Sequence, residues 1–107
     1  SQLSITAVDR LRALSATQQA ERSWQSILSW REVIDYSYFA SHAFMQSISK
    51  TGEEATTWKT IAQGYKEACN LRIKAAEAYE AENETEGKRY YKEGEEAFDK
   101  AWDWKKY

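Results

Sequence analysis

The chain has no proline, only four glycines, one cysteine and one histidine among its 107 residues. A chain of β-strands would normally show turn residues about every ten positions, so the scarcity of proline and glycine argues against a β fold. A single cysteine excludes an internal disulfide framework. A single histidine excludes the paired histidines that hold two irons inside a helical bundle.

The chain also lacks a charge surplus of one sign and a long hydrophobic run. It carries 15 lysines and arginines against 17 acidic residues, a net charge of −2, whereas binding to a phosphate backbone requires a basic surplus. The longest uncharged stretch, Tyr36–Ser49, has 14 residues, and a membrane-spanning helix needs about 20 apolar ones. We therefore expect a soluble, cytoplasmic protein with no nucleic-acid partner and no membrane span.

The residues that are present favour helix. Alanine is abundant, and runs of Glu, Lys, Gln and Arg fill much of the chain. Thr51 with Glu54, and Asn83 with Glu86, have the spacing of helix N-caps, and Ser15 with Gln18 is a weaker third case. The sequence predicts one domain over residues 1–107, an all-α antiparallel bundle of three long helices plus a short N-terminal helix. The predicted helices span residues 3–14, 18–49, 52–82 and 85–105.

Hydrophobic periodicity agrees with these boundaries. In the predicted helix 52–82, apolar residues recur at steps of three and four and form one stripe. Its main members are Ala55, Trp58, Ala62, Tyr65, Cys69, Ala76 and Tyr79. In the predicted helix 85–105, Gly87 and Gly94 lie seven residues apart on one face, a spacing that favours close helix packing. The segment from Val33 to Ile48 is apolar on most of its circumference, which is typical of a helix that is central or that contacts something besides its own bundle.

The chemistry-bearing residues do not form a convincing site. Cys69 and His42 are the only candidates for a thiol–imidazole dyad. If two helices double back near Thr51, Cys69 faces about position 33, and the two side chains lie roughly 13 Å apart along the helix axis. A nucleophile and its base must meet at about 3 Å. We expect no catalytic, cofactor or metal site, and we read the acidic run from Glu77 to Glu86 as a solvated helix end.

Unequal helix lengths point to a binding surface. The predicted hairpin of 18–49 and 52–82 is longer than the helix 85–105, which reaches back only to about residue 63. The end of the hairpin would then stay open and apolar, as partner sites often are. The residues predicted to bind there are Phe39, Phe44, Met45, Ile48, Trp58 and Ile61. The alternative is a bend in the first long helix that folds this end back onto the bundle.

These observations favour a non-catalytic helical protein–protein interaction module, such as an adaptor, subunit or accessory protein. Its partner would be another protein or a second copy of the chain in a homo-oligomer. The alternative is a bundle that binds a small ligand in an aromatic-lined cavity. The residues that would line this cavity are Trp24, Trp30, Tyr36, Tyr65 and Tyr79. The triplet Asn83-Glu84-Thr85 leaves glycosylation open.

Overall fold

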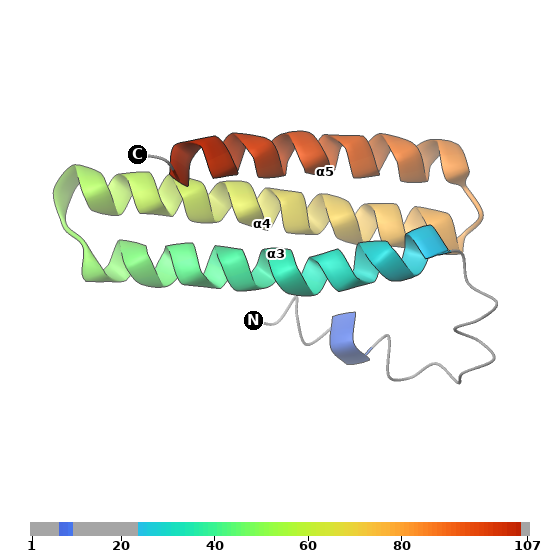
Figure 1. Ribbon diagram of the computed structural model, residues 1–107, viewed down its shortest axis with the longest axis horizontal. Helices are drawn as coiled ribbons and strands as arrows, with labels where there is room; N and C mark the ends of the chain where they lie inside the picture. Colours follow the sequence, from blue (N-terminus) through green and yellow to red (C-terminus); the bar gives the residue numbers. More distant parts are fainter. Residues whose placement is uncertain (1–6, 10–23, 106–107) are drawn as a thin grey trace.

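The computed structural model describes residues 7–9 and 24–105, and three long helices make up nearly all of this part. They are α3 (Trp24–Ser49), α4 (Gly52–Glu80) and α5 (Glu84–Lys105). Each runs antiparallel to the one before, and α4 lies between the other two in a single layer (Figure 1). The all-α antiparallel architecture predicted from the sequence is confirmed.

The predicted helix boundaries agree with the structure to within a few residues wherever they can be compared. Helix α3 ends at Ser49 and α4 begins at Gly52, as expected, whereas α4 ends two residues earlier and α5 begins one residue earlier than predicted. Of the predicted helix 3–14, residues 7–9 are described and are helical, and Ala7 is fully buried. The remainder of that helix, the cap at Ser15 and the start predicted at residue 18 lie outside the described residues.

The turn between α3 and α4 is made by Lys50 and Thr51. Thr51 is extended at the N-cap position of α4, but its side chain makes no capping hydrogen bond, so the predicted helix start is confirmed and the predicted capping interaction is not. Gly52 follows with φ of 62°, the left-handed region that glycine adopts without steric cost.

The turn between α4 and α5 is a Schellman motif. The amide of Asn83 donates to the Ala78 carbonyl at 2.9 Å, and the amide of Glu82 donates to the Tyr79 carbonyl at 3.1 Å. Glu82 takes the left-handed position usually filled by glycine, with φ of 60°. Asn83 then caps α5, because its Oδ1 accepts the Glu86 amide at 3.2 Å. The predicted Asn83 cap is confirmed.

The helices pack closely where small residues meet. A Cβ atom placed on Gly87 would lie 2.7 Å from the ring of Tyr79, and one on Gly64 would lie 2.9 Å from the Cβ of Ala101. A Cβ atom placed on Gly94 would lie 3.0 Å from a guanidinium nitrogen of Arg72. The close packing predicted for Gly87 and Gly94 is therefore confirmed, and it sets the short distance between α4 and α5.

Aromatic side chains divide between the interior and the surface. The ring of Phe98 stacks on Tyr36 with centroids 4.6 Å apart and also contacts Tyr65 at 5.5 Å. These contacts join α3, α4 and α5 on one face of the layer. Trp24 and Tyr38, by contrast, are each 69% exposed on α3. The aromatic residues thus do more than fill the core.

Candidate functional site

The exposed large apolar side chains of the described residues are concentrated on one helix. Only Trp102 lies elsewhere, on α5, and α4 contributes none. The members on α3 are Trp24, Leu28, Tyr38, Phe44, Met45 and Ile48. Because α3 forms one edge of the layer, its outer side is covered by neither α4 nor α5 (Figure 1). Helix α3 is therefore the candidate interaction element.

Three of these residues gather near the turn that joins α3 to α4. Phe44, Met45 and Ile48 are 51%, 63% and 64% exposed, and we call these three side chains the tip. Trp58 lies on α4, partly buried, with its ring edge-on to that of the exposed His42 at 6.4 Å. Charged residues such as Lys50 and Glu53 are exposed at the adjoining turn. An apolar centre with a polar rim is typical of a protein-binding surface.

The tip is open because α5 stops before it. The turn between α3 and α4 extends past the end of α5 (Figure 1). The last part of α5 covers α4 through Ala101, which packs with Ile61 and Ala62. Ile61 is consequently only 1% exposed and cannot contact a partner from the surface. Phe39 is partly buried as well, and its ring packs against Tyr65 at 5.6 Å.

The six residues predicted to bind a partner therefore occupy different environments. Phe44, Met45 and Ile48 form an exposed group, whereas Trp58 is partly buried and its ring contacts that of His42. Phe39 and Ile61 belong to the interior, which corrects their placement on the open surface. The sequence misplaced Ile61 because Ala101 of α5 packs against it, beyond the point near residue 63 that α5 was expected to reach.

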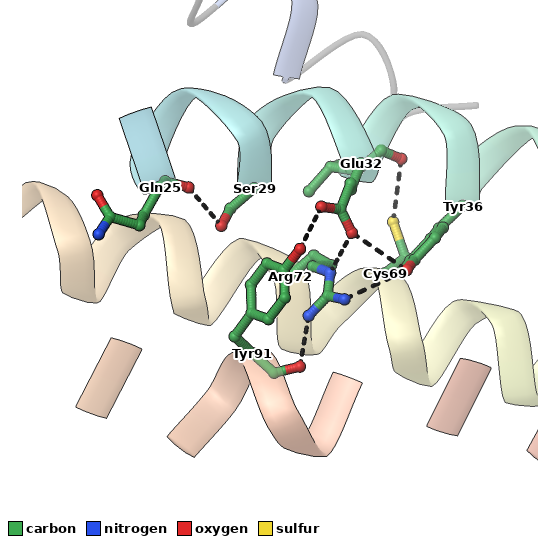
Figure 2. Close-up of polar contacts among 8 residues, drawn as sticks. Gln25, Ser29, Glu32, Tyr36, Cys69, Arg72 and Tyr91 are labelled. Atoms are coloured by element: carbon green, nitrogen blue, oxygen red, sulfur yellow. Dashed lines mark hydrogen bonds and ion pairs between the residues drawn. The ribbon is translucent and has the colours of Figure 1, made fainter. Parts of the chain in front are cut away.

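The opposite half of the layer holds a buried charged cluster that sequence reasoning missed. Arg72 of α4 is 1% exposed, and its Nε donates to Oε2 of Glu32 on α3 at 2.7 Å. Its Nη1 donates to the main-chain carbonyl of Tyr91 on α5, and its Nη2 donates to the Tyr36 hydroxyl at 3.3 Å (Figure 2). The Tyr91 hydroxyl closes the cluster by donating to Oε1 of Glu32 at 2.6 Å. We call these four residues the Arg72 cluster.

The Arg72 guanidinium keeps its charge. Burial lowers the pKa of the Arg72 guanidinium, but the facing Tyr36 and Glu32 more than offset this, so the net shift is upward. Burial also raises the pKa of Tyr36 and Tyr91, and Glu32 raises the pKa of both further. The guanidinium also lies 3.5 Å from the centroid of the Tyr91 ring, a cation–π contact. Each charged group has its partners within the chain, so the Arg72 cluster ties three helices together.

The spacing of apolar residues in α4 could have indicated that Arg72 lies on the buried face. The apolar stripe of α4 runs through Tyr65, Cys69, Ala76 and Tyr79, and the steps of three and four place Arg72 between Cys69 and Ala76. A charged residue at such a position must be paired when it is buried. Neither the partner nor the degree of burial could be read from the spacing.

Cys69 and His42 lie as the hairpin register predicted. The Cys69 thiol contacts the main-chain carbonyl of Val33, with Sγ 3.4 Å from the oxygen, whereas His42 lies beside Trp58. Val33 and His42 are nine residues apart on α3, which corresponds to roughly 13 Å. Burial raises the pKa of Cys69 to about 11, so the thiol is protonated at neutral pH. The predicted separation is confirmed.

The five aromatic residues suggested for a ligand cavity do not converge. Trp24 is exposed, and the Trp30 indole donates to Glu80 near the end of α4 at 2.5 Å. Tyr36 and Tyr65 pack against Phe98 in the interior. The fifth residue, Tyr79, packs over Gly87. The described structure gives this alternative no specific support.

Neither a metal-binding group of side chains nor a membrane-spanning helix occurs in the described part of the chain. It contains no group of three or more His, Cys, Asp or Glu side chains placed to hold a metal ion. None of its helices combines the length and apolar character needed to cross a membrane.

Comparison with known proteins gave no match among family models, curated proteins or solved structures.

Proposed function

We propose that the protein is a non-catalytic helical interaction module that inserts its tip into an apolar groove of another protein. The observation that carries this proposal is the gathering of Phe44, Met45 and Ile48, each more than half exposed, at an end of the layer that α5 leaves uncovered. Aromatic side chains and methionine are enriched in the core of protein interfaces.

The shape of the tip favours a partner with a groove over a second tip. Two helices and their turn project past α5 and make a convex end (Figure 1). Two convex ends would meet over little area, whereas a stable interface buries about 800 Å² on each partner. A concave apolar surface can enclose all three tip side chains.

The polar groups favour a structural role in place of a chemical one. The Cys69 thiol is buried and protonated, and the charged side chains of the Arg72 cluster are paired with one another. A general acid or base needs access to a substrate proton. The surface that can meet another molecule is thus mainly apolar at the tip.

The test is affinity capture from an extract of the source organism with three versions of the chain. The versions are wild type, Phe44→Ser/Met45→Ser at the tip, and Gln63→Ser/Lys66→Ser as a control on the exposed side of α4. We expect at least one protein to be retained by the wild type and the control but lost from the tip variant. Far-UV circular dichroism of all three versions checks that the helices are intact.

Identical sets of retained proteins for the three versions would contradict the proposal. A captured protein that depends on the tip is then purified and titrated by calorimetry. We expect Phe44→Ser/Met45→Ser to weaken binding at least about 100-fold, because losing two buried anchors costs roughly 3 kcal/mol or more.

A further inference from the structure

The outer side of α3 carries a second pattern, distinct from the tip. Exposed residues recur along it at alternating steps of four and three, the spacing of a coiled-coil seam. They run from the start of α3 to the residue beside Trp58, and we call them the outer stripe. Its members are Trp24, Leu28, Arg31, Asp35, Tyr38 and His42.

The outer stripe is symmetric in sequence about residue 33. Arg31 and Asp35 lie two residues to either side of this centre, and Leu28 and Tyr38 lie five to either side. Trp24 and His42 lie nine residues to either side of residue 33. An antiparallel pair of identical helices related by a two-fold axis at this centre would place each residue opposite its counterpart.

Those counterparts are chemically complementary. We propose that two copies of the chain associate through the outer stripe of α3, antiparallel about residue 33, with Arg31 of each copy paired with Asp35 of the other. The same symmetry operation packs Leu28 against Tyr38 twice and Trp24 against His42 twice. A two-fold interface requires such self-complementarity, because one surface must fit itself.

Charge selects this register over its neighbours. Moving the axis by half a heptad toward the tip places Arg31 opposite His42 and Asp35 opposite Tyr38, and moving it the other way places Arg31 opposite Leu28. Neither arrangement pairs opposite charges, and unpaired charge in an interface is unfavourable. Within the described residues the ion pairs are those of Arg72 and Arg89, so Arg31 and Asp35 are available.

The proposed pairing has a consequence for the tip. In an antiparallel dimer centred on residue 33, the two tips lie at opposite ends of the assembly and leave each other free. If the tip binds a partner, as we propose above, the dimer is bivalent and gains avidity for clustered partners. The bivalence rests on that proposed function, whereas the pairing itself does not.

The test uses charge reversal, with molecular mass measured by sedimentation equilibrium up to about 1 mM, where weak pairs associate. We expect the wild type to approach the dimer mass as concentration rises. Arg31→Asp places Asp opposite Asp35, and Asp35→Arg places Arg opposite Arg31. Each variant alone should dimerise at least about tenfold more weakly, because two favourable pairs become two repulsive ones.

Mixing the two variants decides the register. An Arg31→Asp chain and an Asp35→Arg chain are complementary at both charge pairs, so the equimolar mixture should recover the dimer mass that neither shows alone. The double variant Arg31→Asp/Asp35→Arg should dimerise like the wild type. A monomeric wild type at 1 mM, charge variants that associate as well as the wild type, or a mixture that stays monomeric would each overturn the proposal.

A tip variant separates this proposal from the previous one. Phe44→Ser should dimerise like the wild type, since Phe44 lies off the outer stripe, whereas Met45 lies three residues after His42 and continues the spacing of the stripe. Loss of its dimer would place the contact at the tip and overturn the pairing through α3. Retention of the dimer together with loss of captured partners would support both proposals independently.

Discussion

The Arg72 cluster and the tip differ in the kind of residue they contain and in how deeply those residues are buried. At the Arg72 cluster the guanidinium of an α4 residue that is 1% exposed finds partners on both α3 and α5. At the tip, three apolar side chains that are more than half exposed lie beyond the end of α5. The Arg72 cluster stabilises the fold through buried polar contacts, whereas the tip leaves apolar side chains exposed to solvent. Stability and binding should therefore respond to different substitutions.

The largest effect on stability is expected from Arg72→Ala. Removing one partner of a buried ion pair typically costs about 3 kcal/mol or more, because the remaining charge loses its compensation. The Tyr36 hydroxyl and the Tyr91 main-chain carbonyl also lose a donor. Urea unfolding followed by circular dichroism measures the change, with Lys66→Ala on the exposed side of α4 as a control that should stay within about 0.5 kcal/mol. An Arg72→Ala chain as stable as this control would refute the structural role of the Arg72 cluster.

A smaller loss is expected from Gly87→Ala, at the same end of the layer. The new methyl group would lie 2.7 Å from the Tyr79 ring, and overpacking of this kind costs about 1–3 kcal/mol. Alanine recovers about 1 kcal/mol of helix propensity, so the net loss should be about 1 kcal/mol. At an exposed helical glycine the same substitution would stabilise the protein. The sign of the change in thermal unfolding thus tests the close approach of α4 and α5.

The two turns should respond in opposite directions, each by about 0.5–1 kcal/mol. Glu82 has φ of 60° at the turn near the Arg72 cluster, so Glu82→Gly should raise the free energy of unfolding. Gly52 has φ of 62° at the turn near the tip, so Gly52→Ala should lower it although nothing crowds the site. Thermal unfolding of each variant, compared with that of the wild type, gives the sign of each change. Equal signs would mean that backbone strain is not what distinguishes these turns.

The smallest effect on stability is expected from Met45→Ser. Its side chain is 63% exposed, so the fold loses little apolar burial, and the change in the free energy of unfolding should be about 0.5 kcal/mol. The same substitution should weaken partner binding, which is where the tip differs from the Arg72 cluster. A loss above about 2 kcal/mol in urea unfolding would show that Met45 supports the fold.

Much of the fold followed from local patterns. Scarce glycine, absent proline and the cap at Asn83 placed the helix ends to within two residues where they can be compared, because capping depends on neighbouring residues. The hairpin register followed from rise per residue and correctly set Cys69 against Val33. The spacing of Gly87 and Gly94 indicated where α4 and α5 come closest.

Features that depend on three helices at once were not predictable in the same way. The burial of Ile61 requires Ala101 of α5 to reach it, and this depends on where α5 begins and ends. The pairing of Arg72 with Glu32 joins residues 40 positions apart through the packing of α5 on both. Periodicity identifies the face on which a residue lies but not the side chains that meet there. The exposed group at Phe44, Met45 and Ile48 was accessible to prediction because it lies on one helix next to a turn.

The central claim is that the tip serves an intermolecular contact, and Met45 offers a direct probe because it is the single methionine of the chain. With its methyl group labelled with ¹³C, the protein gives one methyl resonance that reports on the tip alone. In an extract of the source organism this resonance should shift or broaden for the wild type and stay sharp for a Phe44→Ser chain at the same concentration. A wild-type resonance unchanged from buffer to extract would contradict the claim.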